Sequence, residues 1–110
     1  MDAEPIKWHK IANDVNEINW QQNHMTFVEV AGKKITIARH KDKIFACAYQ
    51  CPHASGVLSD GYLDALGNLV CPLHNYKFNL VNGRNISGEG YFLKTYVTES
   101  RPNGIFIGFE

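Results

Sequence analysis

Residues 51–61 read CPHASGVLSDG, and a near-echo, CPLHNYKF, follows at residues 71–78. In each segment a cysteine and a proline are followed within two residues by a histidine, which gives two pairs: Cys51 with His53, and Cys71 with His74. The surrounding residues are small or turn-forming, so both segments are predicted to be loops between strands. A thiol and an imidazole this close together, twice in one chain, indicate that the two loops bind metal jointly.

The order of these four side chains bears on which metal they bind. Thiolate and neutral imidazole are common ligands of both zinc and iron, so composition leaves a zinc site and a two-iron cluster open. Zinc sites with two cysteines and two histidines usually pair like with like, whereas each loop here supplies one of each. A 2Fe-2S cluster with thiolates on one iron and imidazoles on the other needs this alternation. The spacing favours the cluster, and a zinc-stabilised binding module is the alternative from another class.

The composition excludes several kinds of partner and compartment. The 110 residues carry no formal net charge, so neither nucleic acid nor a membrane surface is expected as a partner. The N-terminal segment has no apolar leader, and no later stretch is long enough to cross a bilayer. Three cysteines fit metal ligation in a reducing compartment better than a disulfide framework. We therefore expect a soluble, cytoplasmic protein.

The rest of the chain predicts β-structure. Period-two alternation and short apolar runs predict antiparallel strands over residues 25–30, 34–40, 43–49, 68–70, 77–81, 91–99 and 104–110. The pair Asn82 and Gly83 predicts a two-residue hairpin, because both residues tolerate positive φ. Residues 13–18 are the only helical pattern and are expected to form a turn or so. The prediction is one all-β domain over residues 1–110, a small antiparallel sandwich or barrel.

The two ligand segments resemble the signature of a known family. Cys51-Pro52-His53, seventeen intervening residues and then Cys71-Pro72-Leu73-His74 are similar to the C-x-H and C-x-x-H motifs of Rieske iron-sulfur proteins. The flanking GVLSDGYL and YKF are similar to Rieske-type ferredoxins and to the electron-transfer domains of bacterial oxygenases. The likeness covers nearly the whole chain. It implies the Rieske fold, in which two loops form a cluster-binding subdomain.

The resemblance also implies roles for the ligands. Cys51 and Cys71 would bind the inner iron of a 2Fe-2S cluster, and His53 and His74 the outer iron, next to the edge through which electrons pass. The protein would be a one-electron carrier between a flavin-containing reductase and a terminal enzyme such as an aromatic-ring oxygenase. It would be an electron-transfer component of an oxidoreductase system rather than a stand-alone catalyst. The alternative among redox proteins is the small subunit of an assimilatory nitrite reductase.

The sequence departs from part of this family. Rieske proteins of respiratory and photosynthetic complexes join the two loops by a disulfide, but the matching positions here are Ser55 or its neighbour and Leu73. A tyrosine that bonds to sulfur in those relatives is matched by Phe78, and many relatives have glycine in place of Asn75. These differences assign the chain to the low-potential soluble branch. A third loop, which often carries prolines, reads NISGEGYF at residues 85–92 and has none.

The remaining candidates are expected to have structural roles. Cys47 lies in a strand pattern and is expected to be a small buried hydrophobe. Asp60 and Asp64 lie in a turn and are expected to be solvated. Three further histidines have no partner at metal spacing and are expected at the surface or in packing: His9, His24 and His40.

Overall fold

The computed structural model describes residues 6–52, 56–73, 75–87 and 90–109. The strands are β1 (Lys7–Ala12), β2 (Met25–Val30), β3 (Lys33–His40), β4 (Lys43–Ala48), β5 (Tyr62–Leu63), β6 (Asn68–Val70), β7 (Lys77–Asn79), β8 (Thr95–Arg101) and β9 (Gly104–Phe109). Two short 3-10 helices, η1 (Val15–Glu17) and η2 (Leu58–Asp60), complete the elements. The prediction of an all-β fold is confirmed. None of the helices among the described residues has the length and apolar character needed to span a bilayer.

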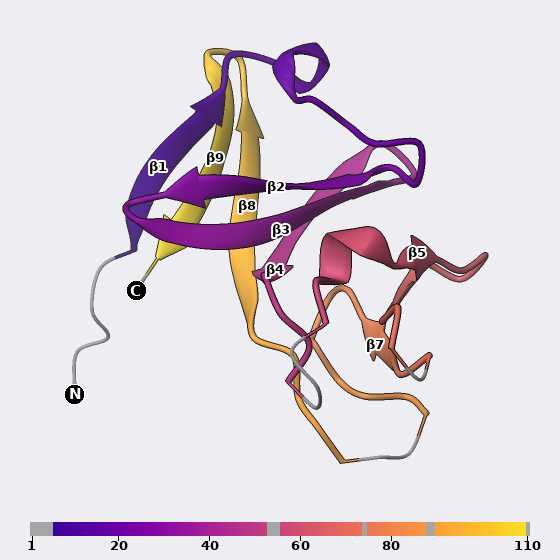
Figure 1. Cartoon of the computed structure of the whole chain (residues 1–110). Helices are drawn as coiled ribbons and strands as arrows, with labels where there is room; N and C mark the ends of the chain where they lie inside the picture. Colours follow the sequence, from indigo (N-terminus) through magenta and orange to yellow (C-terminus); the bar gives the residue numbers. More distant parts are fainter. Residues whose placement is uncertain (1–5, 53–55, 74, 88–89, 110) are drawn as a thin grey trace.

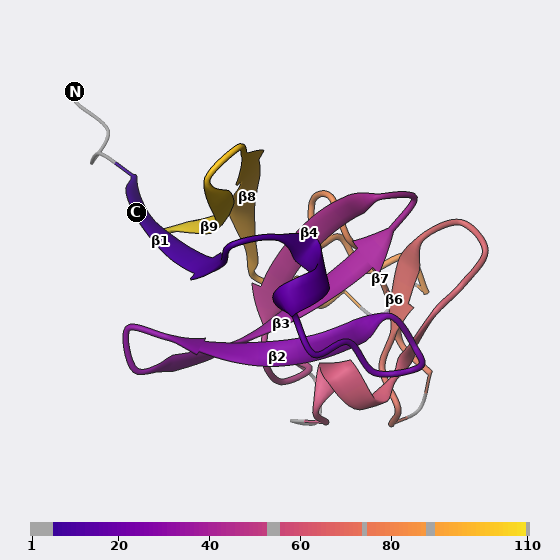
Figure 2. The ribbon, with the colours of Figure 1, turned by 90° about the horizontal axis from the view of Figure 1, so that it is seen from above.

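The strands form two antiparallel sheets. The larger has the order β1-β9-β8-β4-β3-β2, and the smaller has the order β5-β6-β7. The larger sheet curls, as Figure 2 shows from above. Its two outer strands, β1 and β2, come close to each other. The smaller sheet and η2 lie to one side of this curled sheet (Figure 1).

Strands β2, β3 and β4 separate two hydrophobic cores. Ile35 and Ile37 of β3 belong to the core inside the curled sheet, whereas Ala38 belongs to the core on the opposite face. This second core contains Leu58 of η2 and side chains of the small sheet, among them Leu69. Because alternate side chains of a strand point to opposite faces, β3 is buried on both sides. Burying a side chain such as Ile37 completely contributes about 1.5–3 kcal/mol.

The small sheet belongs to a segment inserted between two neighbouring strands. β4 and β8 pair at Ala46 with Tyr96 and at Cys47 with Thr95, and the intervening chain forms η2, β5, β6 and β7. The backbone N–H of Ala48 donates to the carbonyl of Lys94 at 2.9 Å, so the two ends of the inserted segment meet. Hydrogen bonds therefore hold the segment closed at the sheet.

A side-chain amide fastens the inserted segment to the chain that precedes β2. Asn23 donates from Nδ2 to the carbonyls of Ser59 and Gly61, at 2.8 and 2.9 Å. Helix η2 also contacts β2 and β3. The inserted segment is thus held against one face of the curled sheet.

Two of the predicted elements were wrong in detail. The strand expected from residue 91 begins at Thr95. The hairpin after β7 is closed by residues 80–83 rather than by two residues, because the N–H of Asn79 donates to the carbonyl of Arg84. The Asn79 side chain accepts from the N–H of Val81 at 2.8 Å, and this local bond turns the chain early. Of the expected turn pair, only Gly83 has a positive φ, at 76°.

Candidate metal centre

The two cysteine loops have the same backbone closure. The N–H of Cys51 donates to the carbonyl of Gly56, and the N–H of Cys71 donates to the carbonyl of Tyr76, each at 2.8 Å. The first loop follows β4 and the second follows β6, as the two segments predict. Each cysteine bonds to the fifth residue after it, so both cysteines lie at the base of their loops.

The structure brings the two thiols together in the core. Cys51 is 2% exposed and Cys71 is fully buried, and neither forms a disulfide. The pKa of the Cys71 thiol is raised to about 11, mainly by burial and further by the hydrogen bond with Cys51, while the N–H of Leu73 acts in the opposite direction. Leu73 donates to the Cys71 sulfur at 3.4 Å. A metal ion would reverse this preference, because it binds the thiolate and displaces the proton.

The other two predicted ligands cannot be compared with the structure in the same way. His53 and His74 lie outside the described residues, so their part in the site stays a prediction. Asn75, which follows the second histidine, has a φ of 56°, in the left-handed region that asparagine tolerates better than most residues. Among the residues that the structure describes, no three His, Cys, Asp or Glu side chains are grouped to hold a metal ion.

A glycine brings the first cysteine segment against the strand that leads to Cys71. Gly61 ends η2, and a Cβ built on it would lie 1.9 Å from the carbonyl oxygen of Val70. No side chain fits there, so a larger residue would push the two segments apart. Glycine at this position therefore sets the distance between the first loop and the strand β6.

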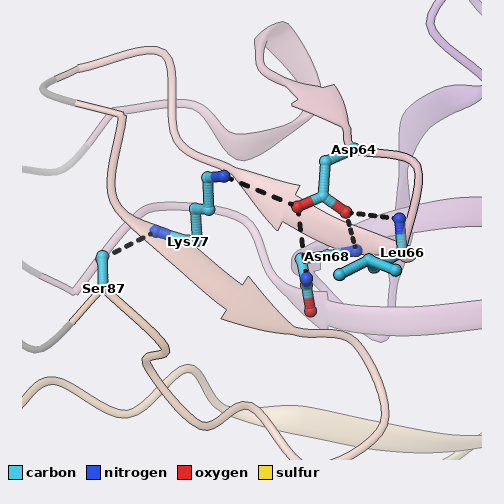
Figure 3. A network of polar contacts seen from close by, with 5 residues as sticks. All are labelled: Asp64, Leu66, Asn68, Lys77 and Ser87. Carbon is cyan, nitrogen blue, oxygen red and sulfur yellow. Dashed lines mark hydrogen bonds and ion pairs between the residues drawn. The ribbon is translucent and has the colours of Figure 1, made fainter.

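Asp64 is the centre of a polar network in the small sheet, drawn in Figure 3. Its carboxylate accepts from the backbone N–H groups of Leu66 and Asn68, both at 2.9 Å, and from the Asn68 amide at 3.2 Å. Lys77 of β7 lies 3.8 Å from the same carboxylate and donates its backbone N–H to Ser87. The expectation that Asp64 is solvated was wrong, whereas Asp60 is exposed as expected.

This network affects the charge of Asp64 and the support of the second cysteine loop. Burial raises the pKa of the carboxyl group, but the hydrogen bonds from Asn68 and Leu66 and the charge of Lys77 together lower it below its usual value. The carboxylate ties the β5–β6 turn to β7, on either side of Cys71. The sequence signal was an aspartate followed at short range by glycine and asparagine, which is typical of a turn closed by the aspartate itself.

The residues expected to have structural roles do so. Cys47 is 1% exposed, and burial raises the pKa of its thiol to about 12. The His9 ring packs on Phe109 with centroids 4.9 Å apart, and the His40 ring lies against Gly67. His24 is exposed.

The two buried, adjacent thiols fit a metal centre, and comparison with known families identifies which kind of centre it is. The family model of the Rieske [2Fe-2S] domain matches residues 7–93, and the chain therefore belongs to this family. Its cofactor is a [2Fe-2S] cluster, which the two adjacent buried thiols fit. The family match favours the cluster over the zinc site.

Two curated relatives are ferredoxin components of oxygenase systems. The ferredoxin component of the alkene monooxygenase system of Xanthobacter autotrophicus is 26% identical over 78% of this chain and 70% of its own length. The ferredoxin component of the naphthalene 1,2-dioxygenase system of Pseudomonas putida is 35% identical over 52% of this chain and 54% of its own length. The chain thus matches about half of the second relative.

Solved structures show the same fold. The ferredoxin–oxygenase complex of carbazole 1,9a-dioxygenase contains a chain with a TM-score of 0.75 and 23% identity, covering 91% of both chains. A protein described as an NADH-dependent nitrite reductase small subunit from Mycobacterium tuberculosis has a TM-score of 0.82 and 18% identity, covering 97% of this chain and 98% of that one. At these identities the likeness concerns the fold alone.

Proposed function

We propose that this protein is the ferredoxin of an oxygenase system, a one-electron carrier with a Rieske cluster. The observation that carries the proposal is the meeting of Cys51 and Cys71 at the bases of two loops with the same closure. Two curated relatives of the chain are ferredoxin components of such systems. When bound, a [2Fe-2S] cluster supplies a centre that takes up and releases one electron.

The protein's part is to hold and tune this centre. Cys51 and Cys71 would bind one iron, and His53 and His74 the other. Leu73 directs its N–H to the Cys71 sulfur, where a hydrogen bond stabilises negative charge. The burial of both cysteines keeps water from the sulfur ligands.

The names of the relatives support an oxygenase as the electron acceptor, and the resemblance to Rieske-type ferredoxins implies the reductase. A terminal oxygenase would receive the electron, and a flavin-containing reductase would supply it. We place this exchange in the cytoplasm, which is supported by cysteines that form no disulfide among the described residues. A nitrite reductase small subunit is the second candidate, favoured by the fold likeness alone, whereas the sequence relatives favour the oxygenase ferredoxin.

The test begins with the cofactor. Purified protein should contain about two iron atoms and two acid-labile sulfides per chain and should accept one electron. Cys51→Ser and Cys71→Ser should lose the cluster, and Cys47→Ser is the matched control that should keep it. One zinc per chain without sulfide would overturn the proposal.

A second step separates the two redox functions. The reduced protein should restore turnover to a terminal oxygenase that has been deprived of its own ferredoxin. Restored nitrite reduction by a catalytic subunit that lacks its small subunit, without restored oxygenase turnover, would favour the second candidate instead.

A further inference from the structure

The third loop, which has no proline, places a tyrosine against the second cysteine loop. The ring of Tyr91 lies 5.9 Å from the ring of Tyr76, centroid to centroid, with 33° between the planes. Tyr76 packs in turn against the buried group that contains Cys51 and Cys71, and its carbonyl accepts from the N–H of Cys71. Tyr76 thus packs on the core that holds the cysteines, and Tyr91 packs on Tyr76.

Backbone hydrogen bonds fix both ends of the third loop. The N–H of Ile86 donates to the carbonyl of Lys77 at 2.9 Å, and the N–H of Leu93 donates to the carbonyl of Gly83 at 2.8 Å. Only glycine allows this approach at position 83, because a Cβ there would lie 1.9 Å from the Leu93 carbonyl oxygen. The loop is thus anchored on β7 and on the turn that follows it.

Neighbouring aromatic residues of this loop have different surroundings. Tyr91 is 41% exposed and contacts Tyr76, whereas Phe92 is 68% exposed. Of the two, Tyr91 is the less exposed and has its ring against the second loop. Phe92 offers a comparison for any general effect of altering the loop.

We propose that Tyr76 and Tyr91 are positioning residues that keep water from the cysteine-bound side of the cluster and so lower its reduction potential and slow its loss. The inference rests on the proposed function. An aromatic layer excludes water and keeps the local dielectric low. The reduced cluster carries one more negative charge than the oxidised cluster. A low dielectric disfavours the state with more charge, so the tyrosine pair favours the oxidised cluster.

The test compares variants of the protein with its cluster bound. Tyr91→Ala should raise the reduction potential and speed the loss of iron to a chelator about tenfold, the rate equivalent of a strong aromatic contact. Tyr91→Phe keeps the ring and should match the natural protein in both measurements. Phe92→Ala is the matched control and should leave both unchanged.

Several outcomes would contradict the inference. An unchanged potential and an unchanged rate of iron loss in Tyr91→Ala would overturn it, and so would equal changes in Phe92→Ala. If Tyr91→Ala fails to fold by circular dichroism, Tyr91→Leu replaces it, and values for Leu equal to those for Phe would then overturn the aromatic role. A natural protein without iron and sulfide would overturn the proposed function as well, whereas an intact cluster insensitive to Tyr91 would overturn only this inference.

Discussion

Gly56 of the first cysteine loop lies directly against Leu73 of the second. A Cβ built on Gly56 would lie 3.1 Å from both Cγ and Cδ1 of Leu73, and 3.3 Å from the Cys71 sulfur. The sequence resemblance identifies Leu73 as the place of a disulfide cysteine in other Rieske proteins, with Ser55 or its neighbour as the partner. Gly56, a neighbour of Ser55, lies at this contact. Packing thus joins the loops at the point where those relatives have a covalent bond.

The first prediction concerns this contact. Gly56→Ala should destabilise the protein by about 1 kcal/mol or more, because the added methyl group forces Leu73 and Cys71 to move. The midpoint of urea unfolding measures the change. Gly56→Ala combined with Leu73→Ala should cost less than the sum of the single changes, since the second change removes the clash. Additive costs would show that the two residues do not meet.

The second prediction uses the buried thiol of Cys47. Its pKa is raised to about 12 in the folded protein from a usual value of 9.0. The neutral thiol is favoured by folding, so its contribution to stability is complete below about pH 9 and is lost as the pH rises toward 12. The free energy of unfolding should fall less steeply over this range in Cys47→Ala than in the natural protein. Parallel curves would contradict the shift.

Cys47 should also be unreactive in the folded protein. A thiol reagent should modify it at least about tenfold more slowly than in urea, because the thiolate is the reactive form and the site is closed to solvent. Modification at the unfolded rate at neutral pH would mean that the strand pair around Cys47 opens easily.

The third prediction concerns Asp64. Replacing it by alanine should destabilise the protein by about 1–3 kcal/mol, because the hydrogen bonds from Leu66 and Asn68 lose their acceptor. The folded pKa of Asp64 is depressed, so its contribution is present above the usual value of 3.8 and is lost as the pH falls through the folded pKa. The exposed Asp60→Ala is the matched control and should change stability little. Equal losses in both variants would refute the special role of Asp64.

The fourth prediction tests the low-potential branch through Phe78. This ring is fully buried in the same core as Cys51 and Cys71. In high-potential relatives the matching tyrosine bonds to sulfur, so Phe78→Tyr should raise the potential by about 60 mV if the bond favours the reduced state by about 1.4 kcal/mol. The absorption spectrum must first show an intact cluster. An unchanged potential would indicate that position 78 does not face a sulfur atom.

The sequence predicts a strand well when the pattern that marks it lies within the strand itself, and poorly when the strand depends on a distant partner. β2 has an alternating pattern and β3 and β4 contain apolar runs, and all three were predicted within a residue of their ends. β1 was not predicted, because its KWHKIA pattern is mixed and its strand character comes from pairing with β9 at the other end of the chain. The apolar residues before Thr95 have the pattern of a strand, but in the structure they belong to the third loop, where Tyr91 packs on Tyr76.

The site residues likewise divide into those with a short sequence motif and those whose contacts depend on the fold. Spacing alone indicated that Cys51 and Cys71 belong together, because metal ligands come in short, recognisable motifs. The contact of Tyr76 with Tyr91 has no such spacing, since it depends on how the third loop folds back. Asp64 was misjudged because a turn aspartate that closes its own loop has the same composition as a solvated one.

The inserted segment leaves and re-enters the curled sheet at two backbone groups, Ala48 and Lys94, that bond to each other. In the topology of the curled sheet, the residues between Ala48 and Lys94 therefore form one long connection between the adjacent strands β4 and β8. Closing such a loop depends only weakly on its length, and even reducing it to a short turn would change the entropy term by roughly 2 kcal/mol. The closure itself therefore tolerates insertions and deletions among the redox elements, provided that the side chains packed on the curled sheet, such as Leu58 and Leu69, keep their contacts.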